Sequence, residues 1–332
     1  MRMHKWSALC LAALIVSGHL AAQTPNPAPN ANPKPKPHRH TPHPMVSSAE
    51  LLVENDVVFG KGGTQDLHSE IAYPRGATKP LGAVIFVHGG GWVLGSYLGG
   101  LTGQIATHGY FAMSIEYRLS GVAKWPAQIQ DCKCAVRFLR ANAAKYNIDP
   151  NRIAVFGASA GGHLVACLGT MTDPADEGDG GSPGVSSAVQ AVVDWYGPTD
   201  FTRPEITSPG VLNLMKSLMG VPYDQNPALW KSASPVYFVA AGDPPMFLAH
   251  GLSDPLVPPA SSTEMDTALA KANVPHQLLL VKNAGHDFGQ VGPEPIDPPF
   301  KEILQQSLDF LDKYIGPPQK PVAVVPWPPA KT

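Results

Sequence analysis

Six short, continuous hydrophobic runs recur along the middle and later parts of the chain. They cover residues 82–88, 111–117, 152–156, 188–193, 246–250 and 277–281. Runs of this length without polar alternation are typical of strands that are buried on both faces of a sheet. Two earlier runs, 57–59 and 67–73, flank the glycines of residues 60–63, so they predict a hairpin with its turn at those glycines.

Helical spacing occurs between these runs. Residues 126–147 carry hydrophobic side chains at intervals of three and four, which predicts one buried stripe along a helix. The stripe consists of Ile129, Cys132, Val136, Leu139, Ala143 and Tyr146. Cys134 lies about 200° around the helix from Cys132 and is expected outside the stripe. Further helices are predicted over residues 160–168, 261–273 and 300–315.

The alternation of strands and helices predicts an α/β protein with a mostly parallel central sheet and helices on both faces. We expect one folded domain over residues 45–316. Residues 199–234 lack clear strand patterns and contain scattered prolines, so we interpret them as an insertion. Residues 317–332 are proline rich and are predicted to form a tail beyond the domain.

The first 22 residues have the pattern of a secretory signal peptide. A basic start with Arg2 and Lys5 precedes a mostly hydrophobic stretch that is shorter than the ~20 residues of a membrane-spanning helix. We therefore expect export to the periplasm or the medium, without a stable membrane anchor. Residues 23–44 are proline rich, which predicts an extended linker. We interpret its histidines as solvated linker residues rather than as metal ligands.

Composition excludes some classes of partner. The chain has 332 residues, a net charge of −2 and only 15% charged residues, so it does not indicate a nucleic-acid-binding protein. Three cysteines remain after removal of the signal peptide: Cys132, Cys134 and Cys167. They allow at most one disulfide, of Cys167 with Cys132 or Cys134, or three free thiols.

A strand, a tight turn and a helix surround Ser159. The turn has the G-x-S-x-G pattern over residues 157–161, and this context exposes a serine hydroxyl at a strained position. A serine needs a base to take its proton, and the base needs a carboxylate that fixes its tautomer. In an open α/β sheet these groups come from loops at the carboxyl ends of the strands. Ser159 is therefore the candidate nucleophile.

His286 and Asp254 follow the last two predicted strands. The chain order Ser159, Asp254, His286 is that of a hydrolase built around such a nucleophile turn. Asp194, Asp200 and Asp287 compete for the role of the acid, although Asp287 is disfavoured because adjacent loop side chains rarely meet head-on. Asp254 is the favoured candidate.

A glycine run over residues 88–92 follows the strand 82–88 and has the sequence H-G-G-G-W. Its backbone amides are able to approach a substrate oxygen because no side chain obstructs them. We expect the N–H groups of Gly90, Gly91 and Ala160 to form an oxyanion hole. Trp92, Trp195 and Tyr196 are candidates for stacking on an aromatic acyl group or a sugar, with core packing as the alternative.

These motifs together resemble the α/β-hydrolase fold over about residues 50–315, and within it the esterase and lipase group with an H-G-G-G-W motif. The likeness is greatest to the acetyl-xylan and feruloyl esterase-like (BD-FAE-like) carbohydrate esterases. It implies Ser159 as nucleophile, His286 as base and Asp254 as its partner, with no cofactor and no metal. The large helical cap of related enzymes is not evident, so residues 199–234 or 173–187 form at most a small lid.

The sequence therefore predicts an exported serine carboxylesterase that acts through an acyl-enzyme. The expected substrates are short-chain esters or plant-polysaccharide esters carrying acetyl or feruloyl groups. A serine peptidase or an arylformamidase on the same fold is the first alternative. A non-catalytic module that binds polysaccharide is the second.

Overall fold

The computed structural model describes residues 50–173, 176–203 and 208–319. The predicted signal peptide, the linker and most of the predicted tail lie outside these residues, as does the start of the domain predicted at residue 45. Among the described helices, none combines the length and the hydrophobicity that a membrane span requires.

Eight strands form one sheet in the order β1-β2-β4-β3-β5-β6-β7-β8. The strands are β1 (Leu51–Gly62), β2 (Gln65–Pro74), β3 (Leu81–Val87), β4 (Phe111–Ile115), β5 (Ile148–Ala158), β6 (Ala191–Trp195), β7 (Met246–Gly251) and β8 (His276–Val281). Strands β3 to β8 pair in parallel, whereas β1 and β2 are antiparallel to their neighbours. The predicted α/β class and mostly parallel sheet are confirmed.

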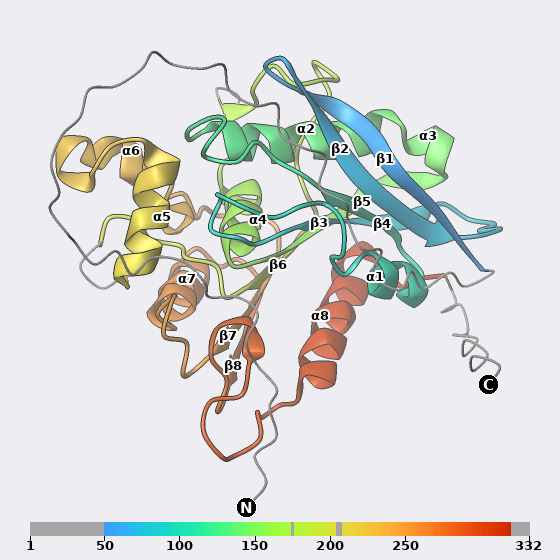
Figure 1. Cartoon of the computed structure of the whole chain (residues 1–332). Helices are drawn as coiled ribbons and strands as arrows, with labels where there is room; N and C mark the ends of the chain where they lie inside the picture. Colours follow the sequence, from blue (N-terminus) through green and yellow to red (C-terminus); the bar gives the residue numbers. More distant parts are fainter. Residues whose placement is uncertain (1–49, 174–175, 204–207, 320–332) are drawn as a thin grey trace, which may run out of the picture. The chain divides into compact units, whose positions relative to one another are not determined.

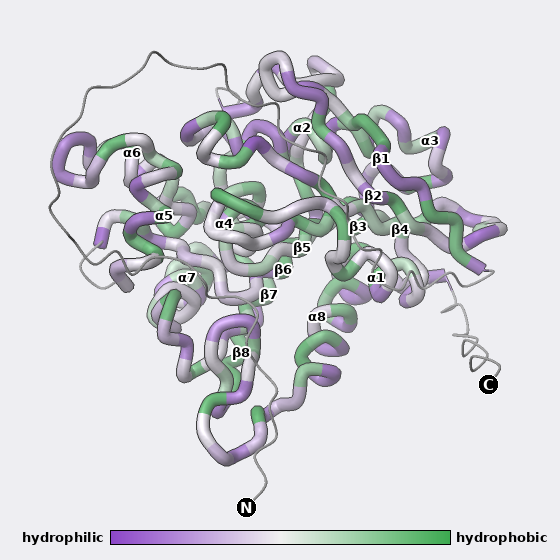
Figure 2. The backbone as a smooth tube through the Cα atoms, in the orientation of Figure 1, coloured by the Kyte–Doolittle hydropathy of each residue, from purple (hydrophilic) through white to green (hydrophobic). Residues whose placement is uncertain are grey.

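Helices cover both faces of the sheet (Figure 1). One hydrophobic cluster packs α1 (Thr102–His108) and α8 (Phe300–Ile315) on one face. The cluster on the other face contains α2 (Ala127–Ala141), α3 (Ala143–Tyr146), α4 (Ala160–Thr170) and α7 (Ala260–Lys271). Neighbouring residues of β3 alternate between the two clusters, and the central strands are mostly hydrophobic in Figure 2. This double burial is why the strands read as continuous hydrophobic runs.

The hairpin differs from its prediction. Strands β1 and β2 continue to Gly62 and Gln65, which pair directly, so the connecting turn is residues 63–64 and not residues 60–63. Gly60 pairs with Leu67 within β1, and the position requires glycine because a Cβ there would collide with Sγ of Cys134 on α2. Cys134 is only 1% exposed, so the expectation of a single buried stripe on this helix is wrong. The hairpin packs on the side of α2 that a single amphipathic stripe would leave to solvent.

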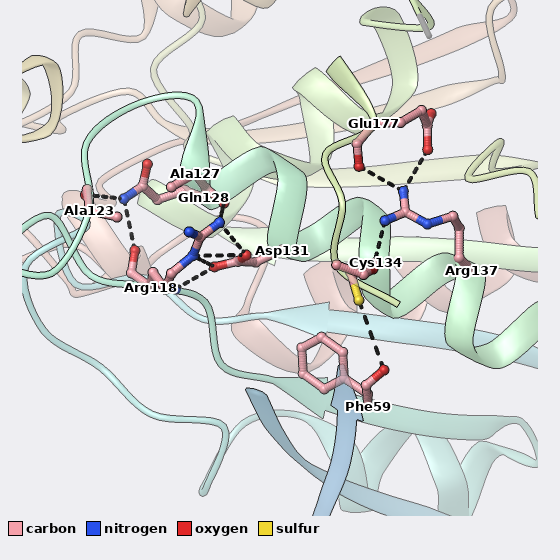
Figure 3. A network of polar contacts seen from close by, with 10 residues as sticks. Phe59, Arg118, Ala123, Ala127, Gln128, Asp131, Cys134, Arg137 and Glu177 are labelled. Atoms are coloured by element: carbon pink, nitrogen blue, oxygen red, sulfur yellow. Dashed lines mark hydrogen bonds and ion pairs between the residues drawn. The ribbon is translucent and has the colours of Figure 1, made fainter. Parts of the chain in front are cut away.

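Buried ion pairs fix the position of α2 (Figure 3). Asp131 accepts hydrogen bonds from the backbone N–H and the guanidinium of Arg118, which follows β4. Arg137, 3% exposed, donates to the carboxylate and the carbonyl of Glu177. The helix predicted over 126–147 divides at Asn142 into α2 and α3. All three cysteines are buried and free, so neither possible disulfide forms.

Candidate active site

Ser159 lies in the turn between β5 and α4, with the unusual backbone angles φ 57° and ψ −119°. Its backbone N–H donates to the carbonyl of Trp195 at 2.9 Å, which ties the turn to β6. Gly161 is required beside it, since a Cβ there would collide with the carbonyl oxygen of Val87 on β3. The tight approach of α4 to β3 therefore holds the strained serine in place.

His286 faces this serine from the loop after β8. Its Nε2 lies 2.9 Å from Oγ of Ser159, and its Nδ1 lies 2.7 Å from Oδ2 of Asp254. The structure thus brings the three predicted residues together in one hydrogen-bonded chain. With Nδ1–H donated to the carboxylate, Nε2 carries the lone pair that accepts the serine proton.

Asp254 lies in the turn after β7 with its side chain fully buried. Burial opposes its ionisation, but hydrogen bonds from His250 and His286 outweigh it and hold the pKa of Asp254 below its usual range. Its other oxygen, Oδ1, accepts the backbone N–H groups of Leu256 at 2.8 Å and Val257 at 3.0 Å. The carboxylate is therefore ionised and fixed in orientation.

The three rival acids do not contact His286 through a hydrogen bond. Asp194 at the end of β6 accepts the N–H of Gly197 at 2.9 Å. Asp200 accepts hydrogen bonds from Thr202 and from the hydroxyl of Tyr237. Asp287 is exposed and accepts the N–H of Gly289 at 3.1 Å. Among these aspartates the geometry selects Asp254.

Two buried groups near the nucleophile turn titrate in unusual ranges. Burial lowers the pKa of His163 on α4 to about 4, against a smaller opposing effect of its hydrogen bond to the Ala233 carbonyl. Burial raises the pKa of Asp194 to about 7, although the hydrogen bond from Gly197 lowers it. His163 is therefore neutral at pH 7, and Asp194 keeps its proton to higher pH than an exposed aspartate does.

The glycine loop after β3 lies against the nucleophile. A Cβ on Gly89 would lie 3.3 Å from Cβ of Ser159, and Gly90 and Gly91 have φ values of 104° and 59°. Within the described residues, no protein acceptor pairs with the N–H of Gly90, Gly91 or Ala160. Ala160 is also the first residue of α4, where the helix dipole favours negative charge. The three predicted oxyanion donors are thus available.

Tyr117 contacts the first residue of this loop, His88. The sequence analysis does not identify Tyr117 as a site residue. Its ring stacks on His88 with 4.4 Å between centroids, and its hydroxyl donates to the His88 carbonyl at 3.2 Å. Burial lowers the pKa of His88, so this imidazole is neutral. Both residues are side chains of the packed interior that shape the loop carrying the oxyanion donors.

The aromatic residues predicted to stack on substrate are placed in the interior. Trp92 is 1% exposed and contacts the rings of His163 and Phe201. Trp195 is 3% exposed and donates its Nε1–H to Ser307 on α8. Tyr196 packs its ring edge-on against the imidazole of His286, 4.8 Å between centroids. The first two are core residues, and Tyr196 buttresses the base.

In the part of the chain that the structure describes, the two predicted lid segments lie in different places. Residues 208–234 form α5 (Pro209–Met219) and α6 (Pro227–Ser232). Leu214 of α5 packs on Gly91, because a Cβ on that glycine would lie 2.5 Å from the Leu214 Cδ1 atom. Residues 177–188 instead border a cavity of about 530 Å³ with Met171, which follows the end of α4 remote from Ser159.

The described residues contain no group of three or more histidine, cysteine, aspartate or glutamate side chains arranged to hold a metal ion. The contacts of Ser159, His286 and Asp254 offer nucleophilic attack by a serine with general base help. Its geometry places a nucleophile, a base, an oriented acid and unpaired backbone donors around one point.

Comparison with known proteins agrees with this geometry. Residues 69–269 match the BD-FAE family. Esterase LipQ of Mycobacterium tuberculosis is 33% identical over 70% of this chain, which spans only 57% of LipQ. A truncated carbohydrate esterase from gut microbiota is 29% identical, with a TM-score of 0.68 over 81% of this chain and 99% of that one.

The propionate-bound esterase Est2 of Thermogutta terrifontis is 27% identical. Its TM-score is 0.64, over 81% of this chain and 96% of that protein. The family match covers more than half of the chain and includes the glycine loop, the nucleophile turn and Asp254. The chain belongs to the BD-FAE family of α/β-hydrolase esterases.

Proposed function

We propose that the protein hydrolyses carboxylic esters through an acyl-enzyme on Ser159. The observation that carries this proposal is the continuous chain from Oγ of Ser159 through His286 to the buried carboxylate of Asp254, with separations of 2.9 and 2.7 Å. These distances lie within the range in which a base takes a proton directly.

The reaction follows from the atoms in place. Oγ of Ser159 attacks the ester carbonyl carbon while Nε2 of His286 takes the hydroxyl proton. The carbonyl oxygen becomes an oxyanion, which the free amides of the glycine loop and of Ala160 stabilise. The bond to the alcohol then breaks, and His286 returns the proton to the leaving oxygen. Water repeats the cycle on the acyl-enzyme and releases the acid.

We propose short acyl groups, on carbohydrate-linked esters, as the substrates. Leu214 packs directly on Gly91, so the space beside one predicted oxyanion donor is restricted by a branched side chain. The names of two structural neighbours, a carbohydrate esterase and an esterase with bound propionate, support this class. An acetyl group fits this arrangement better than a bulky feruloyl group.

The test compares acetylated xylan, methyl ferulate and p-nitrophenyl esters of increasing acyl length. Acetyl esters should react fastest, and a fluorophosphonate probe should label wild-type enzyme but not Ser159→Ala. Preference for a peptide or for formyl-kynurenine would support the two alternative hydrolases instead. Absence of probe labelling would support a non-catalytic binding module.

Two substitutions on α5 test which acyl size the site accepts. Leu214→Ala removes the side chain that packs on Gly91 and should raise the butyrate-to-acetate rate ratio by about tenfold, as one or two methylenes gain space. Asn213→Ala, on the exposed side of α5, should leave the ratio unchanged. An equal ratio in both variants would place the acyl group elsewhere.

We also propose that the protein is exported, on the basis of the signal-peptide pattern in residues 1–22. Expression of the full chain in a Gram-negative host, followed by amino-terminal sequencing of the soluble product, tests this. The expected first residue lies near Ala22 or Gln23. An unprocessed product in the cytoplasm would overturn the proposal.

A further inference from the structure

A second histidine contacts the carboxylate that orients the base. His250 is the fifth residue of β7, four residues before Asp254, and its side chain is completely buried. Its Nε2 lies 3.3 Å from Oδ2 of Asp254, the same oxygen that accepts the hydrogen bond from His286. The mechanism described above assigns no task to this imidazole.

The contacts of His250 specify where its proton lies. Nε2 faces two acceptors, the carbonyl of Val257 at 3.0 Å and the carboxylate of Asp254, so Nε2 carries a hydrogen. Nδ1 lies 2.7 Å from Oγ of Ser262, whose hydroxyl is able to donate to it. Ser262 belongs to the first turn of α7 and is fully buried. The hydroxyl therefore favours the tautomer that points N–H toward Asp254.

We propose that Ser262 and His250 are positioning residues that extend the catalytic chain, so that five side chains run from Ser262 through His250, Asp254 and His286 to Ser159. The inference rests on the proposed roles of Ser159, His286 and Asp254. In this arrangement Asp254 Oδ2 divides its negative charge between two N–H donors. Asp254 therefore stabilises protonated His286 less than a carboxylate with a single hydrogen-bond donor would.

The charged and titratable neighbours of this chain come from three elements. Asp194 lies on β6, the strand that pairs with β7, which carries His250. Tyr196, which follows β6, packs on His286, and Asp287 adjoins His286 on its own loop. None of them makes a hydrogen bond with either imidazole in the described structure, so Asp254 is the group that joins the two.

Loss of the His250 donor should therefore have a kinetic signature. Oδ2 of Asp254 would act on His286 alone, protonated His286 would be stabilised, and the acidic limb of the kcat/KM profile would move to higher pH. We expect a shift on the order of 0.5 to 1 pH unit. A merely structural role, holding the turn through Val257, would lower the melting temperature without moving that limb.

Two amide replacements separate these roles. In His250→Asn the amide reaches only the position of Nδ1, near Ser262, whereas in His250→Gln it reaches the position of Nε2, near Asp254. His250→Asn should show the shifted limb, and His250→Gln should restore most of the wild-type profile. Ser262→Ala should shift the limb in the same direction by a smaller amount, with Ser261→Ala on the same helix turn as the unchanged control.

The profiles are measured with p-nitrophenyl acetate from about pH 5 to 9, beside melting temperatures and fluorophosphonate labelling. An unmoved acidic limb in His250→Asn, or the same shift in His250→Gln, overturns the inference. If His250→Asn does not fold, Ser262→Ala decides: a shifted limb supports the inference and an unmoved limb overturns it. Failure of the probe to label wild-type enzyme would instead overturn the proposed function.

Discussion

The substitution Asp254→Asn tests the site most directly, because the surrounding donors dictate how the new amide sits. Oδ1 of Asp254 accepts two backbone N–H groups, from Leu256 and Val257, so the amide oxygen of asparagine must occupy that position. The amide NH2 then faces Nδ1 of His286. The imidazole has to accept there and carry its hydrogen on Nε2, toward Ser159, where it is unable to act as a base.

The expected loss is about 10⁴-fold in kcat, or about 5.4 kcal/mol of transition-state stabilisation. Turning the amide around would restore the useful tautomer but leave two buried N–H groups unpaired, at about 1–3 kcal/mol each. That penalty disfavours the productive orientation. KM should change little, because the carboxylate does not touch the substrate.

The assay is steady-state hydrolysis of p-nitrophenyl acetate at pH 7.5, with a melting curve to establish that the variant is folded. Asp287→Asn is the matched control, since Asp287 adjoins the base, is exposed and contacts only the N–H of Gly289 through its carboxylate. It should keep wild-type kcat. A folded Asp254→Asn enzyme with more than about a tenth of wild-type kcat would refute the assignment of the acid.

Three further predictions follow from buried groups. Because His163 is buried in its neutral form, the free energy of unfolding falls as pH drops from about 6.5 toward the folded pKa of His163, about 4. Asp194 acts in the opposite direction: with a folded pKa of about 7, it makes the free energy of unfolding fall as pH rises from about 4 to 7. Asp194→Asn should therefore unmask a slope of about 1.4 kcal/mol per pH unit in urea unfolding between about pH 4.5 and 6.5, and a flat profile would contradict this. Gly161→Ala should lower the free energy of unfolding by at least about 1–3 kcal/mol in the same assay, because a Cβ there collides with β3. Gly103→Ala on α1, with open space around it, should raise the free energy of unfolding by about 0.5–1 kcal/mol. Equal effects of the two substitutions would refute the close packing at Gly161. Tyr117→Phe keeps the stacked ring but loses the hydrogen bond to the His88 carbonyl, so kcat should fall by up to about tenfold. An unchanged kcat would show that this hydrogen bond is not needed to position the oxyanion loop.

Much of the candidate site followed from local sequence. The nucleophile turn, the glycine loop and the loops carrying Asp254 and His286 each adjoin a strand whose hydrophobic run is unmistakable. Since the carboxyl ends of parallel strands meet at one edge, strand order along the chain sufficed to expect that these loops converge. The sequence already favours Asp254 over Asp194, and the structure gives the physical reason: Asp194 lies within β6 and accepts the N–H of Gly197, whereas Asp254 follows β7 and contacts His286.

The sequence predictions that are wrong concern residues whose surroundings come from distant parts of the chain. The glycines predict a turn at Gly60 and Gly62, but both pair with β2 within β1, and glycine occurs there because side chains of Cys134 and Arg118 leave no room for a Cβ. The helical spacing predicts one buried stripe that excludes Cys134. It does not predict the hairpin that packs on the opposite side of the helix and buries Cys134. His250 has one available signal, a histidine at the end of a strand four residues before the acid, but the pattern alone gives no partner for it.

Local sequence patterns were sufficient to predict the strand–helix alternation, the fold class and the residues able to perform acyl transfer. These depend on hydrophobic periodicity and on turn chemistry, both of which act over a few neighbouring residues. Only the packed structure shows that Leu214 of α5 packs on Gly91 and that Ser262 of α7 contacts His250 of β7. Such contacts join positions that packing brings together, and a packed interior fixes them to within tenths of an ångström.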